Sequence, residues 1–300
     1  MKKIDVVIIG GGMAGMTAAI YARRANKSVI VFEKNVYGGQ ITATHAVENW
    51  PGEMSISGTA LMEKVLDQAK ELGTKFCDEE VLSVKKNGDE IVVGTDEGEY
   101  YAASLIIAVG AEERKLGLPN EKELTGRGIS YCATCDGAFY KDKEVAVVGG
   151  GNTALNDALY LSDIASKVYL VHRRNEFRGD AILVERLKER KNVEFVLESK
   201  PVEFIGKKKL TGIKVEDKDG KERVLDVPGV FMAVGKTPQT EIYKDIVDLD
   251  EKGYVIAGED CHTSAKGIYV AGDCRTKNIR QLVTAAGDGA IAATEACRNL

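Results

Sequence analysis

One pattern occurs twice in this chain: a short apolar strand, three consecutive glycines, a helix with one apolar face and a second apolar strand. The first copy occupies residues 4–32 and the second occupies residues 144–171. Short β-branched runs such as residues 4–9 are typical of fully buried parallel strands. A strand, a helix and a second parallel strand form a βαβ unit, so the repeat predicts an α/β fold built on doubly wound sheets.

Further features follow each copy in the same order, which indicates a duplicated domain. Strands joined by polar turns lead in both copies to a buried strand that ends Ala-Val-Gly, at 108–110 and at 233–235. The rest of the chain is too short for a third domain, so we expect the strand at 268–270 and the helix at 281–296 to return to the first. The sequence thus predicts two Rossmann-like, three-layer domains, one of them discontinuous: residues 1–113 with 244–300, and residues 114–243.

The first glycine cluster fits a dinucleotide-binding fingerprint. Gly10, Gly12 and Gly15 match G-x-G-x-x-G directly after a strand and at the start of a helix. Bare backbone amides and the positive end of the helix can receive a pyrophosphate there. Glu33, at the end of the second strand, can accept a hydrogen bond from a ribose hydroxyl. The order of strand, glycines, helix and acid favours this interpretation over a solvated strand end.

The second cluster shares the fingerprint but is followed by the opposite charge. Its fingerprint positions are Gly149, Gly151 and Ala154. Where the first copy has its acid, the chain has His172, Arg173 and Arg174, with Arg178 one turn further. Arginines can hold a 2′-phosphate with charge-assisted hydrogen bonds of about 1.5–3 kcal/mol each, whereas a carboxylate would repel it. The cluster therefore predicts a preference for NADPH rather than an ordinary basic loop, and His172 is given no catalytic role.

A single close pair of cysteines, Cys132 and Cys135, forms a C-x-x-C motif. A zinc site needs two further ligands, and the chain has neither a second C-x-x-C nor a histidine pair, so no metal is expected. In a reducing compartment the motif indicates a dithiol that cycles with a disulfide. Asp136 is either a proton carrier for the departing thiolate or a turn residue before Gly137. The other cysteines are isolated and are expected to be small buried residues: Cys77, Cys261, Cys274 and Cys297.

Charge and hydropathy exclude two classes of partner. The net charge is −5, and the longest run of basic residues is Lys207 to Lys209, which argues against a nucleic-acid surface. The longest apolar runs are far shorter than the ~20 residues of a membrane helix. Met1 and two lysines lead directly into the first strand without the apolar stretch of a signal peptide. We therefore expect a cytoplasmic protein.

With two dinucleotide sites and one dithiol, the sequence closely resembles the low-molecular-weight thioredoxin reductases over essentially the whole chain. The matching segments are residues 10–19, 38–40, 47–52 (V-E-N-W-P-G), 131–137 (Y-C-A-T-C-D-G), 149–154 (G-G-G-N-T-A), 172–178 (H-R-R-N-E-F-R), 271–273 and 280–281.

The resemblance implies a flavoprotein that passes electrons from NADPH through FAD and the Cys132–Cys135 pair to thioredoxin, as a homodimer. It implies FAD contacts from Gly10, Gly12, Gly15, Glu33, Gln40, Asn49, Asp273, Arg280 and Gln281. It implies NADPH contacts from Gly149, Gly151, Asn152, Thr153, Arg173, Arg174 and Arg178. By the same resemblance Cys135 faces the flavin, Cys132 forms the mixed disulfide and Asp136 is the acid and base.

Two positions depart from the family pattern. The chain has Asn156-Asp157 where the family has two acids, and Lys236 where a histidine is common. Two other activities remain open: a ferredoxin-dependent flavin thioredoxin reductase, against which the arginine cluster argues, and a flavin-dependent dithiol oxidase of a small molecule. A non-catalytic nucleotide sensor is disfavoured by the C-x-x-C motif.

Overall fold

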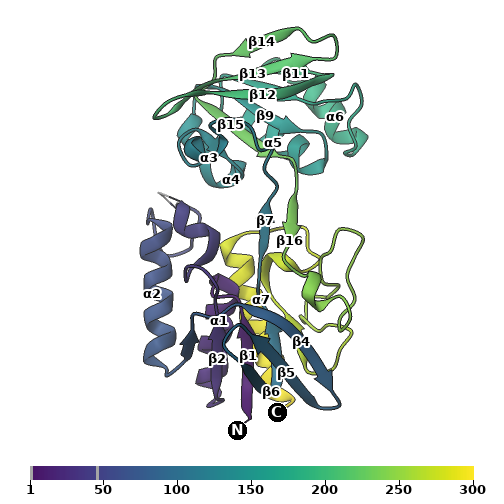
Figure 1. Ribbon diagram of the computed structural model, residues 1–300. Helices are drawn as coiled ribbons and strands as arrows, with labels where there is room; N and C mark the ends of the chain where they lie inside the picture. The colour runs from purple at the N-terminus through teal and green to yellow at the C-terminus, as the bar shows by residue number, and fades with distance from the viewer. Residues whose placement is uncertain (1–2, 45–46) are drawn as a thin grey trace. The chain divides into compact units, whose positions relative to one another are not determined.

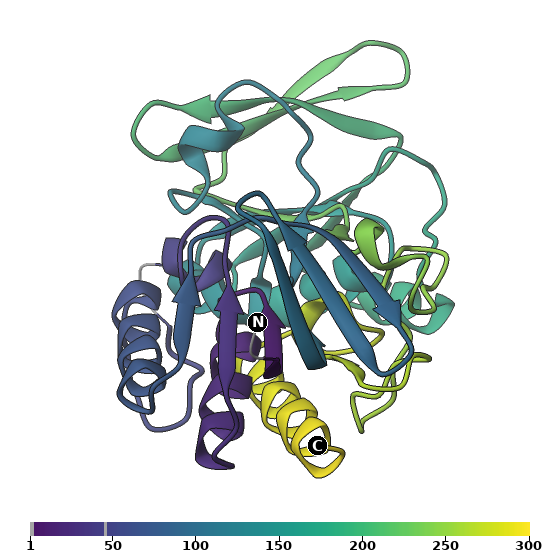
Figure 2. The ribbon, with the colours of Figure 1, turned by 60° about the horizontal axis from the view of Figure 1, so that its bottom comes forward.

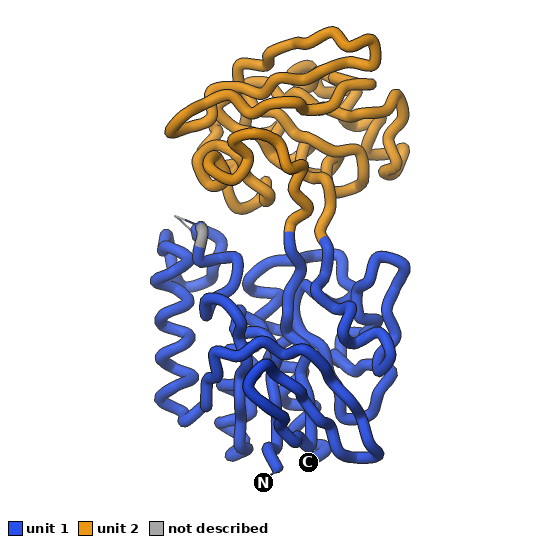
Figure 3. Tube along the Cα trace, viewed as in Figure 1, with its two compact units in different colours: residues 1–112, 237–300 blue, residues 113–236 orange. Residues whose placement is uncertain are grey.

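The computed structural model describes residues 3–44 and 47–300, which form two compact units. Unit 1 comprises residues 1–112 and 237–300, and unit 2 comprises residues 113–236 (Figure 3). The chain passes between the units through β7 (Ala111–Glu113) and β16 (Lys236–Pro238), which pair with each other. Unit 1 is therefore discontinuous in sequence.

The chain returns to unit 1 earlier than the sequence suggests. The sequence predicts a boundary after residue 243, whereas the structure has it after Lys236. The intervening residues include the 3₁₀ turn η3 (Glu241–Tyr243), and the ring of Tyr243 is fully buried in the core of unit 1. Burial of so large an aromatic ring ties its backbone to that core.

A mixed sheet forms the centre of unit 1. Its strands are β1 (Ile4–Ile9), β2 (Val29–Phe32), β3 (Lys75–Cys77), β4 (Val81–Asn87), β5 (Glu90–Thr95), β6 (Glu99–Ile107) and β17 (Ile268–Val270). The order is β3-β2-β1-β6-β5-β4, with β17 also pairing with β6. The pairs around β1 and the β17–β6 pair are parallel, whereas β4, β5 and β6 form an antiparallel meander. The strand at 268–270 thus returns to the first sheet.

Two helices of unit 1, α1 (Met13–Arg24) and α7 (Leu282–Arg298), pack together on one face of this sheet, and α2 (Gly58–Glu71) packs against α1. The unit also contains the short 3₁₀ turns η1 (Gly39–Ala43) and η4 (Gly272–Cys274). Figures 1 and 2 both show α7, in yellow, beside the purple α1. A Cβ on Gly289 of α7 would be 2.2 Å from the carbonyl oxygen of Ala14 in α1, so glycine permits this close packing.

Unit 2 is built on a parallel sheet of five strands in the order β11-β10-β9-β15-β8. These strands are β8 (Ile129–Ser130), β9 (Glu144–Gly149), β10 (Lys167–Val171), β11 (Val193–Val196) and β15 (Gly229–Ala233). An antiparallel sheet contains β12 (Ser199–Gly206), β13 (Leu210–Asp217) and β14 (Glu222–Leu225). The helical segments are α3 (Glu121–Leu124), α4 (Ala133–Asp136), η2 (Gly137–Tyr140), α5 (Asn152–Ser162) and α6 (Ala181–Lys188).

The central strand β9 shows why unit 2 has three layers. Val145 and Val147 pack in a core with Leu155 of α5, whereas Ala146 packs in a second core with Phe204 of β12. Successive side chains of a strand point to opposite faces, so an uninterrupted apolar run requires a cover on both. Helices cover one face of the parallel sheet and the antiparallel sheet covers the other (Figure 1). The α/β fold, the duplication and the layering predicted from the sequence are confirmed.

No helix within residues 3–44 and 47–300 combines the length and the apolar character needed to span a membrane.

Candidate functional site

The glycine loop of unit 1 has the geometry of a phosphate-binding turn. Gly10 has φ of +108°, and a Cβ on it would be 2.3 Å from the carbonyl oxygen of Ala108. A Cβ on Gly15 would be 1.9 Å from the carbonyl oxygen of Gly10. Gly12 caps α1 without a side-chain hydrogen bond. The first amides of α1 thus open onto a turn that has no side chain in the way, which fits a pyrophosphate.

Glu33 lies beside this loop at the end of β2. Its Oε2 accepts a hydrogen bond of 2.9 Å from the amide of Gly11, and its Oε1 accepts one of 2.9 Å from the amide of Asn35. The carboxylate is therefore held next to Gly11, although this glycine lies 22 positions earlier in the sequence. The donors and the acid together suit the pyrophosphate and ribose of a dinucleotide.

Other predicted flavin contacts meet at the start of α7. The Nδ2 of Asn49 donates a hydrogen bond of 3.0 Å to Oε1 of Gln281, and Nε of Arg280 donates one of 3.2 Å to the carbonyl oxygen of Asp273. Gln281 also forms a capping box with Thr284. Segments from three parts of the chain thus converge. Gln40 is not part of this group: its Nε2 donates a hydrogen bond of 2.6 Å to the carbonyl oxygen of Ala111 in β7.

A buried ion cluster holds the turn that carries Asp273. Asp288 of α7 accepts hydrogen bonds from the amide of Gly272 at 2.9 Å, from Arg275 at 2.9 Å and from Lys277 at 2.7 Å. Burial alone would raise the pKa of Asp288, but the hydrogen bonds from these two cations outweigh it and lower the pKa. Sequence reasoning missed this cluster, because nothing local connects Asp288 to residues eleven or more positions earlier.

The second glycine loop, in unit 2, repeats this arrangement. A Cβ on Gly149 would be 2.5 Å from the carbonyl oxygen of Ala233, and Gly151 caps α5 without a side-chain hydrogen bond. A Cβ on Gly151 would meet no atom within 4 Å. The first turn of α5 therefore also presents backbone amides beside open space, which fits a second pyrophosphate.

The imidazole of His172 packs against this loop. A Cβ on Gly150 would be 2.1 Å from the imidazole, whose Nε2 lies 3.1 Å from the carbonyl oxygen of Glu176. The ring is buried and stacks on Phe177, with 5.2 Å between centroids. Burial, together with the neighbouring arginines, lowers the pKa of His172. The imidazole is thus a neutral packing group at neutral pH.

The predicted phosphate-binding arginines follow this histidine. Arg173, Arg174 and Arg178 are all exposed. The amide of Arg178 donates a hydrogen bond of 2.7 Å to the carbonyl oxygen of Gly150, which ties the arginine segment to the glycine loop. The structure thus brings this segment to the loop and places three exposed cations beside it.

Asn152 and Thr153 have different surroundings. Asn152 exchanges two hydrogen bonds with Asp180: its Nδ2 donates to Oδ2 at 3.1 Å, and its Oδ1 accepts from the Asp180 amide at 2.7 Å. Asn152 thereby joins the start of α5 to the residue that precedes α6. Thr153 is exposed in the first turn of α5.

The C-x-x-C pair forms a disulfide in unit 2, with an S–S distance of 2.07 Å and 5.3 Å between the Cα atoms. Cys132 precedes α4 and Cys135 lies within it, and both are partly exposed. The Oγ1 of Thr134 lies 3.5 Å from Sγ of Cys132. Asp136 accepts a hydrogen bond of 2.6 Å on its Oδ2 from the Ser130 hydroxyl. The sequence did not single out Ser130, since one serine outside a motif carries no signal.

The remaining cysteines are free thiols. Cys77, Cys261 and Cys274 are buried and Cys297 is partly buried. Burial raises the pKa of Cys261 and of Cys274 to about 12. A thiol reacts as its thiolate, so these two are unreactive at neutral pH.

Two residues at the positions that depart from the family pattern, Asp157 and Lys236, lie near β7 and β16, the strands through which the chain passes between the units. Lys236 of β16 forms an ion pair of 2.7 Å with Glu113 of β7. Burial raises the pKa of Asp157 in α5 to about 7, with a further contribution from Glu113 and an opposing one from Lys236. Asn156 is exposed.

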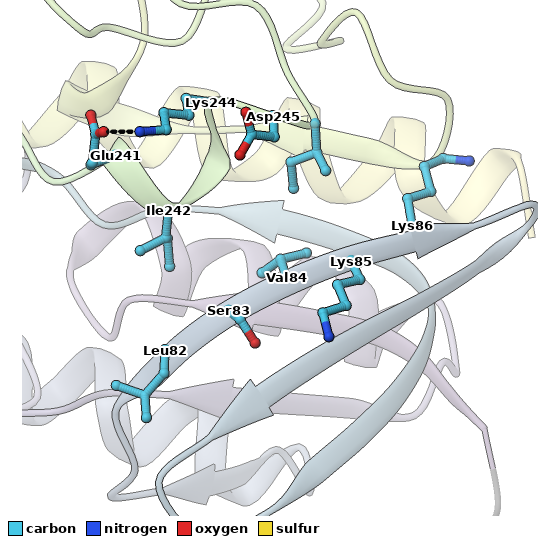
Figure 4. A pocket seen from close by; sticks show the side chains of 10 residues that line it. Leu82, Ser83, Val84, Lys85, Lys86, Glu241, Ile242, Lys244 and Asp245 are labelled. Carbon is cyan, nitrogen blue, oxygen red and sulfur yellow. Dashed lines mark hydrogen bonds and ion pairs between the residues drawn. The ribbon is translucent and has the colours of Figure 1, made fainter.

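A surface hollow in unit 1 lies between β4 and the segment that contains η3 (Figure 4). It is lined by residues 82–86 and by Glu241, Ile242, Lys244, Asp245 and Ile246. Lys244 is paired with Glu241. None of the predicted nucleotide or redox residues lines the hollow, so we give it no part in the reaction.

Comparison with known proteins agrees with this geometry. The family model described as pyridine nucleotide-disulphide oxidoreductase matches residues 4–289. Thioredoxin reductase of Listeria monocytogenes is 44% identical over 297 residues, covering 98% of this chain and 93% of that protein. That of Bacillus subtilis is 43% identical over 295 residues, covering 97% and 93%.

Solved structures give the same result. The thioredoxin reductase of Streptococcus pyogenes matches with a TM-score of 0.94 and 40% identity, over 99% of this chain and 97% of that one. The thioredoxin reductase of Giardia duodenalis matches with a TM-score of 0.93 and 39% identity, over 99% of each chain. The chain therefore belongs to the pyridine nucleotide-disulphide oxidoreductase family and, within it, to the thioredoxin reductases, which are flavoprotein disulfide oxidoreductases that use a pyridine nucleotide.

Proposed function

We propose that this chain passes electrons from NADPH through FAD and the Cys132–Cys135 disulfide to the disulfide of a thioredoxin. The observation that carries the proposal is the C-x-x-C disulfide, partly exposed, in the same compact unit as a glycine loop flanked by three arginines. A disulfide next to solvent can exchange with a protein disulfide, and the loop provides for a phosphorylated electron donor.

Unit 1 is the unit that we assign to FAD. The amides at the start of α1 would hold the pyrophosphate and Glu33 the ribose, while Asn49, Arg280 and Gln281 lie where segments of this unit converge. Bound FAD supplies a carrier that takes up a hydride and passes on electron pairs. The protein contributes binding and orientation.

Unit 2 is the unit that we assign to NADPH. Arg173 and Arg174 are exposed cations, and Arg178 is tied by its backbone to the glycine loop. Because His172 is neutral and packed, the arginines alone set the positive charge of this segment. A doubly charged 2′-phosphate is attracted to them, whereas the ribose hydroxyl of NADH gains little.

The dithiol performs the final exchange. Two electrons and one proton convert the disulfide into one thiolate and one thiol. The Cys132 thiolate attacks one sulfur of the thioredoxin disulfide and forms a mixed disulfide, and the released thioredoxin thiolate takes a proton from Asp136. The Asp136 carboxylate then takes the proton of the Cys135 thiol, and the resulting thiolate attacks the Cys132 sulfur of the mixed disulfide. This restores the Cys132–Cys135 disulfide and releases thioredoxin as one thiol and one thiolate.

The proposal includes the state and location of the enzyme. We assign it to the cytoplasm, because a cycling C-x-x-C dithiol needs a reducing compartment. The resemblance to the thioredoxin reductases supports a homodimer, and sedimentation velocity of the FAD-loaded protein tests this directly.

An anaerobic titration tests the electron path. The FAD-loaded protein receives NADPH while flavin absorbance is recorded, and oxidised thioredoxin, ferredoxin or oxygen is then offered. We expect bleaching by NADPH and rapid reoxidation by thioredoxin. Bleaching by reduced ferredoxin alone, or reoxidation by oxygen faster than by thioredoxin, would favour the alternative activities.

A further inference from the structure

Ser130 connects the two ends of the redox loop through its hydroxyl. Its Oγ lies 2.6 Å from Oδ2 of Asp136 and 3.1 Å from the amide nitrogen of Cys132. The carbonyl oxygen of Cys132 is further away, at 3.3 Å. A hydroxyl has one proton, and its bond to a carboxylate is the stronger one. Ser130 therefore donates to Asp136 and accepts from the Cys132 amide.

The sheet of unit 2, rather than the redox helix, fixes this hydroxyl. Ser130 is the last residue of β8, is only 6% exposed and is paired with Phe231 of β15. Asp136 ends α4, which has only four residues. One turn of helix has little stability of its own, so the bond to Ser130 ties the carboxylate to the sheet.

We propose that Ser130 is a positioning residue for proton transfer at the Cys132–Cys135 disulfide, because it holds Asp136 and leaves Oδ1 as the oxygen that carries the proton. This inference rests on the proposed function, in which Asp136 protonates a departing thiolate. Oδ2 already accepts the Ser130 proton, so the carboxyl proton is carried on Oδ1.

The proton balance of the exchange follows. As the S–S bond of thioredoxin breaks, the bond from Cys132 to one of its sulfurs forms, and the other sulfur leaves with the electron pair. That sulfur takes the Oδ1 proton, and Asp136 becomes a carboxylate. The Ser130 hydroxyl then donates to a full negative charge, which is the stronger hydrogen bond. Ser130 thus favours the ionised product of this step.

The experiment compares Ser130→Ala with a matched control, Ser199→Ala. Ser199 is also 6% exposed in unit 2, and its hydroxyl donates to the carbonyl oxygen of Leu197. Thioredoxin-dependent turnover of the FAD-loaded enzyme is recorded against pH, as is alkylation of Cys132 by iodoacetamide in the dithiothreitol-reduced protein. Removing a donor from a carboxylate disfavours its charged form, so Ser130→Ala should raise the pKa of Asp136 and move the inflection that Asp136 causes in both profiles up by about one pH unit. In turnover, where Asp136 acts in its protonated form, this inflection is the alkaline limb. Ser199→Ala should leave both unchanged.

A double mutant separates positioning from general destabilisation. In an Asp136→Asn background the carboxylate is absent, so adding Ser130→Ala should cause no further change in either profile. Thermal midpoints of the two serine variants report any difference in folding. Unshifted profiles in Ser130→Ala, or an equal effect with and without Asp136, would overturn the inference. Absence of thioredoxin turnover in the unmutated enzyme would instead contradict the proposed function, and the alkylation profile still decides the role of Ser130.

Discussion

The imidazole of His172 lies so close to Gly150 that a Cβ on the glycine would be 2.1 Å from the ring. The residue that begins the basic segment is thereby packed under the second glycine loop, and the amide of Arg178 binds the same glycine from the other end. Loop and arginines form one structural element, so a change at Gly150 must move both.

Gly150→Ala is expected to weaken NADPH binding. The added methyl group would overlap the His172 ring, which is buried and stacked on Phe177. We expect KM for NADPH to rise about tenfold or more, with FAD content unchanged. Steady-state kinetics and flavin absorbance measure this. Gly287→Ala, where a Cβ meets no atom within 4 Å, serves as the control. An unchanged KM for NADPH would contradict the packing argument.

Cofactor preference depends on the arginines. The unmutated enzyme should prefer NADPH over NADH in kcat/KM by something like 10²-fold, from two charge-assisted contacts to the 2′-phosphate. Arg173→Ala with Arg174→Ala should erase most of this margin, mainly through KM. Arg186→Ala, an exposed arginine of α6, should not change it. Equal kcat/KM for NADPH and NADH in the unmutated enzyme would contradict the prediction.

The two cysteines of the disulfide separate the half-reactions. Cys132→Ser and Cys135→Ser should each leave flavin reduction by NADPH intact and abolish reduction of thioredoxin, because neither variant can form the disulfide. Stopped-flow flavin absorbance and an insulin-linked thioredoxin assay measure the two steps. Cys297→Ser, a change at a free thiol, should retain both. Substantial thioredoxin reduction by either of the first two variants would show that the pair is not the relay.

Asp157 makes stability depend on pH. Its pKa is raised from 3.8 to about 7 in the folded protein, so folding takes up a proton and stability falls as the pH rises from about 4 to 7. Asp157→Asn removes that loss and should stabilise the enzyme at pH 8 by about 1–2 kcal/mol, a figure reduced for solvent screening. Urea denaturation at pH 4 and pH 8 measures the difference, which should nearly vanish at pH 4. The exposed Asp67→Asn is the control. A gain that does not grow with pH would refute the assignment.

Local signals in the sequence were enough for the elements that repeat. The strand predicted at 4–9 is β1 (Ile4–Ile9), and the second strand predicted for the copy at 144–171 is β10 (Lys167–Val171). The helix predicted at 281–296 is α7 (Leu282–Arg298). Each is set by apolar periodicity and by glycines that only a tight turn requires, and both signals act over a few neighbouring residues.

The two glycine loops, the exposed arginine segment and the cysteine pair could also be predicted, because the fingerprint, the basic cluster and the C-x-x-C motif are each short and contiguous. The second boundary was not, since it depends on burial of Tyr243 in a core built from distant strands. The bond between Ser130 and Asp136 was not readable either, although only six positions separate them. The position of Ser130 follows from pairing of β8 with β15, a hundred residues away, and only the folded sheet brings the hydroxyl to the carboxylate.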